Sequence, residues 1–123
     1  MCIRDRVDSE HVIMEVAKLE ARFQAGKAWV YKSFSAAEAQ AVEAAAAGDA
    51  PEPALSLAAR MATVHVTREA ADIIQGAYLL AGTTALRDGA LQRCFRDIHA
   101  GTQHAMVSPN ITREFGTSIL EQS

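Results

Sequence analysis

The chain is poor in cysteine, proline and aromatic residues, and it contains no long apolar run. It has two cysteines, three prolines and 6% aromatic residues among its 123 residues. Cys2 and Cys94 are far apart and in no metal-ligand spacing, which argues against a disulfide-stapled secreted domain and predicts a cytoplasmic protein with no bound metal. No window reaches the roughly 18 apolar residues of a membrane helix, and no apolar signal core is present. We therefore expect neither export nor a membrane partner.

The chain also lacks a concentration of charge of one sign. It has 12 Lys and Arg against 15 Asp and Glu, a net charge of −3, and no basic run. Proteins that bind DNA or RNA need basic patches to neutralise phosphates, so the sequence excludes nucleic acid as a partner. With 50% hydrophobic residues, the composition is that of one ordinary globular domain.

The first residues do not join the pattern that follows. Residues 1–8 resemble an artefactual leader, and we expect them to be artefactual or disordered. Residues 9–123 are then the folded domain, which we expect to be the C-terminal fragment of a longer enzyme.

From Ser9 onward, apolar positions recur at steps of four and three, which is typical of one buried helix face. The positions of this stripe are Val12, Val16, Leu19, Phe23, Gly26, Val30 and Phe34. Ser9 is a candidate N-cap, and the alanine-rich stretch 36–47 extends this first helix. Residues 48–53 form a connector, because proline cannot continue a helix. The first helix is longer than so small a domain needs, so we expect one flank of it to face a partner domain or subunit.

Two further segments, 54–82 and 91–105, repeat the same rhythm, and small residues such as Gly26 and Ala62 on the apolar stripes predict close helix packing. Asn110 is expected to cap a short last helix that runs to about Leu120. No segment alternates with period two, so no sheet is indicated. The sequence predicts an all-α fold, an antiparallel four-helix bundle.

On the third of these helices, a rotation of about 100° per residue places Arg93, Asp97, Ala100 and His104 on one polar face. From this pattern alone, an ordinary solvated face with a surface ion pair is the favoured interpretation, ahead of a site that combines an imidazole with small residues. His99 and His104 are five residues apart, so they do not share a face as two helical metal ligands would.

The segments 80–86 (LAGTTAL) and 91–104 (LQRCFRDIHAGTQH) resemble the C-terminal domain of the acyl-CoA dehydrogenase superfamily, most closely the flavin-dependent monooxygenase branch of two-component hydroxylases. The resemblance is strongest over residues 60–109. In that family this part is a four-helix bundle, and the enzymes are homotetramers that receive reduced flavin, FMN or FAD, from a separate reductase. The resemblance also implies N-terminal and middle domains that are missing here, so the chain alone would be inert.

The resemblance also assigns site residues. Common acyl-CoA dehydrogenases carry a Glu-Gly-Thr motif here, whose glutamate removes the α-proton of the thioester, whereas this chain has Gln-His-Ala at 103–105. The monooxygenase branch has a histidine near the reactive edge of the flavin, which implies that His104 is the catalytic residue. It would take a proton from a phenol or form a hydrogen bond to a flavin hydroperoxide. Gly82, Thr83 and Thr84 correspond to residues that contact the flavin, often that of a neighbouring subunit.

The function that the resemblance implies is hydroxylation of an aromatic or related small substrate by reduced flavin and O2. Two alternatives stay open. The first is an acyl-CoA dehydrogenase-like oxidoreductase whose base lies elsewhere, and the second is a non-catalytic helical oligomerisation module. Among the other side chains, we expect core or interface packing for Trp29 and a buried inert thiol for Cys94. The resemblance implies structural or subunit-facing roles for Arg93, Arg96 and Asp97, in which a buried pair of Arg96 and Asp97 would hold the helix against another element.

Overall fold

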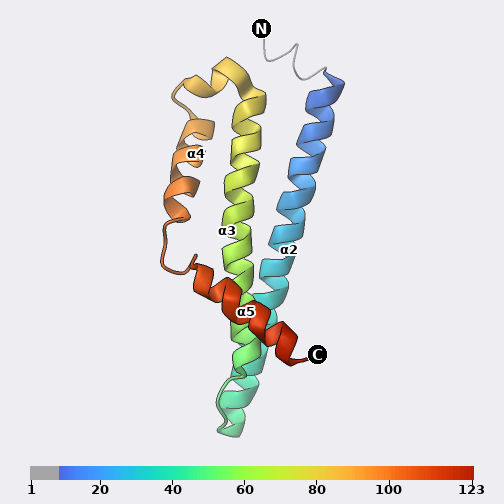
Figure 1. Ribbon diagram of the computed structural model, residues 1–123, viewed down its shortest axis with the longest axis vertical. Coiled ribbons are helices and arrows are strands. Elements are labelled where there is room, and N and C mark those ends of the chain that lie inside the picture. The colour runs from blue at the N-terminus through green and yellow to red at the C-terminus, as the bar shows by residue number, and fades with distance from the viewer. Residues whose placement is uncertain (1–8) are drawn as a thin grey trace. The chain divides into compact units, whose positions relative to one another are not determined.

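The computed structural model describes residues 9–123, apart from the side chain of Thr84, so the predicted leader at residues 1–8 lies outside the described residues. Four α-helices and one 3-10 helix follow one another as α2 (Glu10–Ala47), α3 (Pro53–Ala81), η1 (Gly82–Leu86), α4 (Ala90–Gly101) and α5 (Pro109–Glu121) (Figure 1). Every regular element in the described part of the chain is helical, which confirms the predicted all-α bundle. None of these helices combines the length and apolar character needed to cross a bilayer.

The long helices begin and end at the predicted signals. α2 starts directly after Ser9, whose carbonyl oxygen accepts a hydrogen bond from Ile13 N at 3.0 Å. The alanine-rich stretch is helical to Ala47, and the helix then stops at Gly48, which takes a φ of 77°. α3 begins at Pro53. Proline is favourable as the first helical residue, because the backbone N–H that it lacks would have no partner within the helix at that position.

The described chain divides into two compact units. The first unit contains residues 9–25 and 67–103, and the second contains residues 26–66 and 104–123. Each unit therefore includes a part of α2 and a part of α3.

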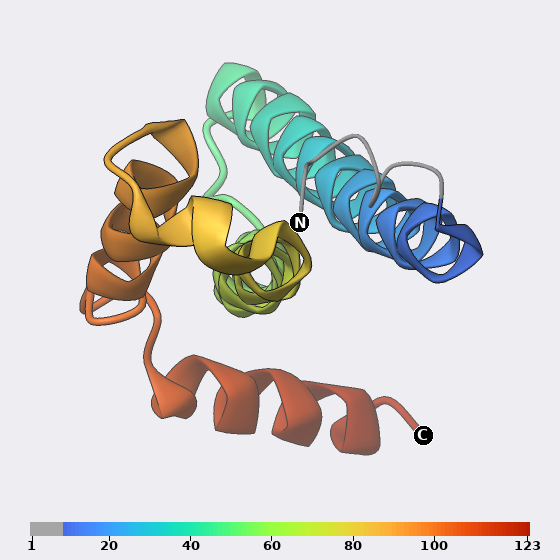
Figure 2. The same cartoon turned by 90° about the horizontal axis from the view of Figure 1, so that it is seen from above.

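In the first unit, α2 and α3 are antiparallel, because Leu19 meets Gly76 whereas Arg22 meets Glu69. A Cβ atom on Gly76 would lie 2.9 Å from Leu19 Cδ2, so the missing side chain makes room for the leucine. α4 packs on the other side of α3 from α2, as Figure 2 shows.

The contact between α3 and α4 is aromatic. The rings of Tyr78 and Phe95 lie 4.7 Å apart between centroids, and the ring of Phe95 lies 4.3 Å from that of His99 on the same helix. Phe95 belongs to the predicted helical segment 91–105, and its ring packs against α3.

In the second unit, α5 crosses α3 rather than running antiparallel to it, as its course across α3 in Figure 1 shows. The core consists of Val64 (1% exposed), Val107 (7%) and Ile111 (3%), with Leu57 and Met61 packed against it. This core is small because it joins only the start of α5 and the preceding turn to α3. The predicted antiparallel arrangement therefore holds for α2 and α3 but not for α5.

Aromatic contacts also join the helices of the second unit. The ring of Trp29 lies 5.5 Å from that of His65 on α3 and 6.3 Å from that of Phe115 on α5. Trp29 is half-buried, so its predicted packing role is confirmed. The predicted small-residue contact is present as well, since Ala62 is fully buried and Gly26 is buried against Val66.

The predicted cap of the last helix is wrong by two residues. Ser108 is the N-cap of α5, and its Oγ accepts a hydrogen bond from Asn110 N at 3.2 Å. Pro109 takes the first helical position, which leaves Asn110 inside the first turn. The side-chain oxygen of Asn110 instead accepts a hydrogen bond from Arg113 at 3.3 Å.

Candidate functional site

The predicted flavin-contacting residues lie together on η1 in the first unit. α3 ends before Gly82 as predicted, because Gly82 takes a φ of 60°, in the left-handed region that favours glycine. The chain continues as the 3-10 helix η1. Ala85 is 2% exposed and anchors η1, whereas Thr83 is exposed to solvent. The backbone of Thr84 belongs to η1, and its side chain lies outside the described atoms.

α4 is shorter than the sequence predicts. It ends at Gly101 with Thr102 as its C-cap, although the apolar rhythm continues to Ala105. The hydroxyl of Thr102 donates a hydrogen bond to the carbonyl oxygen of His99 at 2.6 Å. Glycine and threonine also have low helix propensities, so both residues help to end the helix here. His104 consequently lies beyond α4.

The predicted polar face of α4 is therefore wrong for one of its residues, His104. Arg93 and Asp97 belong to α4, but His104 does not, so the three side chains do not share a helix face. Since His104 belongs to the second unit and η1 to the first, the two parts of the predicted site are described apart.

His104 is an exposed residue in the turn between α4 and α5. Its ring Nδ1 accepts a hydrogen bond from the backbone N–H of Met106 at 3.1 Å. Its carbonyl oxygen accepts a second hydrogen bond from the backbone N–H of Val107 at 2.8 Å. Val107 belongs to the core of the second unit, so its hydrogen bond ties the backbone of His104 to that core.

The hydrogen bond at Nδ1 determines what His104 can do. An acceptor nitrogen carries no proton, so the neutral ring has its hydrogen on Nε2. Nε2–H is then a hydrogen-bond donor. The bond from Met106 N therefore leaves Nε2–H as the free donor of the neutral ring.

Two structural expectations for α4 are wrong. Arg96 Nε lies 4.0 Å from Asp97 Oδ1, and the two side chains are 78% and 77% exposed. An ion pair in that setting contributes little to stability because water screens it. Cys94 is exposed and not buried. Both errors have one cause, since only one narrow face of α4 packs against α3.

A polar pocket of about 540 Å³ lies at the start of α4 in the first unit, lined by Asp88, Gly89, Gln92, Arg93 and Arg96. Two guanidinium groups and one amide are donors suited to an anion, with one carboxylate on the rim. η1 contacts α4 directly, so this pocket and the predicted flavin-contacting turn belong to the same part of the unit. The family resemblance implied structural or subunit-facing roles for the two arginines, although their spacing of three residues at the start of a helix is visible in the sequence.

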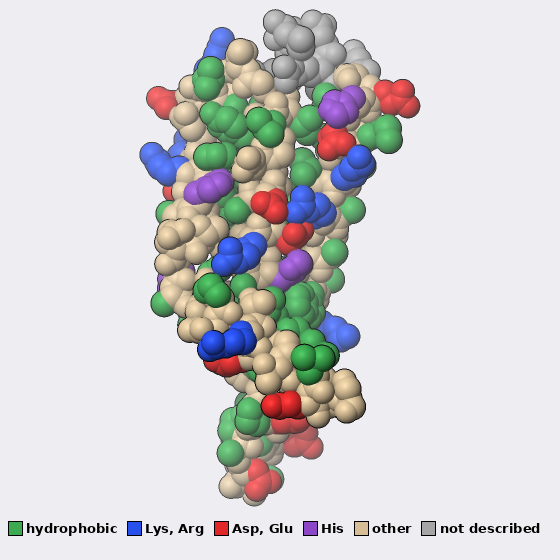
Figure 3. Space-filling view, viewed as in Figure 1, with side chains coloured by type: hydrophobic (Ala, Val, Ile, Leu, Met, Phe, Trp, Pro, Cys, Tyr) green, Lys and Arg blue, Asp and Glu red, His purple; other side chains and the backbone are tan. Residues whose placement is uncertain are grey.

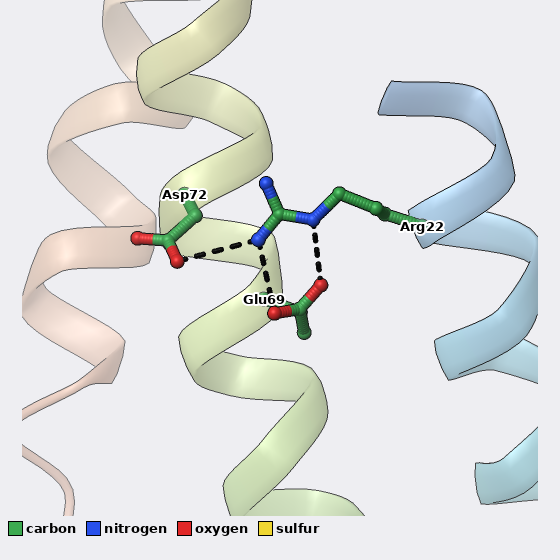
Figure 4. A network of polar contacts seen from close by, with 3 residues as sticks. All are labelled: Arg22, Glu69 and Asp72. Carbon is green, nitrogen blue, oxygen red and sulfur yellow. Dashed lines mark hydrogen bonds and ion pairs between the residues drawn. The ribbon is translucent and has the colours of Figure 1, made fainter. Parts of the chain in front are cut away.

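A network on α2 and α3 went unnoticed in the sequence (Figure 4). Arg22 Nε and Nη2 lie 2.8 and 2.9 Å from the two carboxylate oxygens of Glu69, and Nη2 lies 3.3 Å from Asp72 Oδ2. The hydrogen bond to Glu69 is the main cause that raises the pKa of Arg22, and burial opposes it. The partners are 47 and 50 positions apart, a separation that helical periodicity does not register. The network holds α2 on α3 in the first unit.

In the part of the chain that the structure describes, the remaining polar side chains form no further candidate functional site. On the face that Figure 3 shows, acidic and basic side chains are interspersed over the helices. His99 Nδ1 bonds to the carbonyl oxygen of Phe95 at 2.7 Å, within its own helix. Between residues 9 and 123, no three His, Cys, Asp or Glu side chains are grouped to hold a metal ion.

Comparison with known proteins agrees with this architecture. Residues 4–109 match the family described as acyl-CoA dehydrogenase, C-terminal domain. Indole-3-acetate monooxygenase of Pseudomonas putida is 32% identical over 95 residues, which cover 76% of this chain and 23% of that enzyme. The chain thus spans about a quarter of the length of this relative. No solved structure matches the chain.

The family match includes α2, α3, η1, α4 and the turn that carries His104. The match extends over most of the chain, and the described fold is all-helical. The chain belongs to the acyl-CoA dehydrogenase C-terminal domain family.

Proposed function

We propose that the chain is the C-terminal bundle of a flavin-dependent monooxygenase that hydroxylates an aromatic or related small substrate with reduced flavin and O2. Family membership together with the Gln-His-Ala sequence at 103–105 carries the proposal. Removing the α-proton of a thioester requires a base, and this segment offers no carboxylate for that purpose. The name of the Pseudomonas putida relative supports the monooxygenase branch.

The donors of the first unit fit the phosphate end of a flavin. Arg93, Arg96 and Gln92 line one pocket, and guanidinium groups bind phosphate oxygens in pairs. The exposed hydroxyl of Thr83 and the backbone at Gly82 lie on η1, which contacts the same helix. When bound, the flavin would supply the oxygen chemistry, and these side chains would hold and orient it. FMN and FAD both carry the phosphate that this pocket suits.

His104 has the role of a hydrogen-bond donor in this proposal. The bond from Met106 N keeps Nδ1 occupied, so the ring presents Nε2–H to the substrate or the flavin. The proton stays on Nε2 as long as the turn between α4 and α5 holds. His104 thus orients a reacting oxygen through a fixed donor, and it acts as a base only if the bond to Met106 is released.

Further domains and copies complete the proposed enzyme. The chain spans 23% of its monooxygenase relative, so N-terminal and middle domains of the same enzyme would supply most of the pocket. We include a homotetramer and a separate flavin reductase in the proposal. The half-exposed apolar side chains of α2 support contact with another domain or copy.

Two substitutions of His104 in the complete enzyme test the donor role. Asparagine keeps a polar group near the position of Nδ1 and lacks one near Nε2, whereas glutamine places an amide N–H near Nε2. We expect His104→Asn to reduce hydroxylation by about 100-fold, in the usual range for loss of one proton-handling group. His104→Gln should retain activity within about tenfold of wild type. The assay measures hydroxylated product and O2 consumption with reduced flavin supplied by an added reductase.

Other results would change the proposal. Wild-type rates in both variants would remove His104 from the site. Bleaching of the oxidised flavin by acyl-CoA, with no hydroxylated product, would favour the dehydrogenase alternative. An assembly that flavin does not stabilise against heat would favour a helical module without chemistry.

A further inference from the structure

A hollow of about 480 Å³ lies in the second unit, where residues 48–52 connect the end of α2 to the start of α3 (Figure 1). Both helices and the connector contribute to its lining, and so does Met106 of the turn before α5. All of these lining residues belong to the second unit. The backbone N–H of Met106 donates to Nδ1 of His104, so the hollow adjoins the turn that carries this histidine.

Most of the lining is apolar. Ala37, Ala41 and Ala59 leave space open because alanine has no side chain beyond Cβ, and Ala59 is 5% exposed. Phe34 and Met106 are 48% and 46% exposed, so each keeps about half of its surface open to a ligand. Aromatic and thioether groups both make favourable contacts with an aromatic ring. The hollow therefore suits a ligand that carries such a ring.

The charge on the lining is negative. Glu38 and Glu52 are exposed, and neither carboxylate has a hydrogen-bond or ion-pair partner among residues 9–123. The base in the described lining is Arg60, whose Nη1 lies 3.8 Å from Oε2 of Glu114, so its charge already faces an acid. Unpaired carboxylates attract cations and repel anions. Charge complementarity therefore selects a positively charged ligand.

Two local arrangements bring these carboxylates to the hollow. Gln40 Oε1 accepts a hydrogen bond from the backbone N–H of Glu52 at 2.8 Å, which ties the connector to α2. Glu38 follows Phe34 by four residues on α2, so the carboxylate and the ring are neighbours on one helix face. An ammonium ion is attracted both to a carboxylate and to the face of an aromatic ring. This pair therefore favours an ammonium group over a neutral hydroxyl.

We propose that the hollow binds an arylalkyl ammonium ion. The aromatic ring of the ligand lies against Phe34 and Met106, and its ammonium group lies at the carboxylates of Glu38 and Glu52. The inference is independent of the proposed function, because this binding needs neither flavin nor O2.

Three probes with one carbon skeleton test the preference for charge. 2-Phenylethylammonium, 2-phenylethanol and phenylacetate each carry a phenyl ring on a two-carbon arm, and they are positive, neutral and negative. Amide NMR spectra of the full chain follow a titration with each probe at low salt. We expect a dissociation constant for the cation of roughly 1–10 mM, ordinary for a ligand of about nine non-hydrogen atoms. Phenylacetate should bind at least about tenfold more weakly than the cation. The shifted amides should belong to residues 34–41, 51–63 and 106.

Removing one carboxylate at a time tests the contacts. Glu38→Gln and Glu52→Gln keep the size of each side chain, and each should weaken binding of the cation about threefold, the range for an exposed ion pair. The double variant should weaken it about tenfold and leave binding of 2-phenylethanol unchanged. Glu43→Gln is the matched control, because Glu43 is an exposed acid of α2 outside the lining. Circular dichroism verifies that every variant keeps its helix content.

Three results would overturn the proposal. They are a cation that shifts no amide of the hollow at tens of millimolar, a phenylacetate that binds as tightly as the cation, and a double variant that binds the cation like wild type. Each of these results leaves the proposed hydroxylase function standing, since that function is tested by the His104 variants.

Discussion

Replacing Gly26 by alanine should destabilise the protein, although alanine is the better helix former. Gly26 is buried in α2, and a Cβ atom there would lie 3.2 Å from Val66 Cγ2 on α3. Gly116 offers a matched control in the same unit, because a Cβ atom on it would meet nothing within 4 Å. The two substitutions add the same methyl group to a helix and differ only in what it meets.

The expected magnitudes follow from two opposed terms. Replacing an interior helix glycine by alanine gains about 1 kcal/mol. At Gly26 this gain competes with overpacking, which costs about 1–3 kcal/mol, and the β-branched Val66 has essentially one rotamer in a helix and cannot swing aside. We expect Gly26→Ala to lower the free energy of unfolding by about 1 kcal/mol net, given these two ranges. Gly116→Ala should raise it by about the same amount, since it only gains the helix term.

Urea unfolding followed by circular dichroism measures both free energies. The variants should differ by about 2 kcal/mol, the sum of the opposite effects above. Val66→Ala removes the obstructing methyl groups, so the pair Gly26→Ala with Val66→Ala should show a favourable coupling of about 1 kcal/mol, within the range for residues in contact. Equal stabilisation by Gly26→Ala and Gly116→Ala would refute the close approach of α2 to α3 at this point.

Two further substitutions test the elements that hold each unit. Arg22→Met should lower the free energy of unfolding by about 1 kcal/mol, because it leaves Glu69 and Asp72 as neighbouring carboxylates, and the half-exposed setting limits the loss. The difference from wild type should shrink in 1 M salt, where the Debye length is about 3 Å; an unchanged difference would contradict an electrostatic origin. Ser108→Ala removes the N-cap of α5 and should cost about 1 kcal/mol in thermal or urea unfolding, whereas Ser108→Gly should cost a few tenths. Equal losses in the two would argue against the cap.

The bounds of α2 and α3 were predictable because their signals are local. An N-terminal serine, a run of alanines, a Pro-Gly connector and a terminal glycine each act within a few residues of the boundary that they set. Gly82 illustrates this, since its positive φ ends α3 regardless of the rest of the fold. The cap of α5 was harder, because Ser108 and Asn110 are both good N-cap residues and the proline between them decides.

Which side of a helix is covered was less predictable. Val16, Phe23 and Phe34 lie on the stripe that predicted the core, yet each is about half exposed. Periodicity identifies an apolar face but not what covers it, and the same pattern serves a core and an interface. α2 has an exposed flank in the described chain, and Val16, Phe23 and Phe34 of the predicted stripe belong to it. That a partner domain or subunit covers this flank stays a prediction.

The position of His104 shows why a failed local prediction has functional consequences. In a continued helix, the backbone N–H of Met106 would bond to the carbonyl oxygen of Thr102, four residues earlier. Because α4 ends at Gly101, that N–H is released from the helical pattern and donates to Nδ1 of His104 instead. The imidazole on a continued helix would have had no such local partner to fix its tautomer. In the proposed function, the early end of α4 thus leaves Nε2 as the donor, and His104→Asn compared with His104→Gln tests that role.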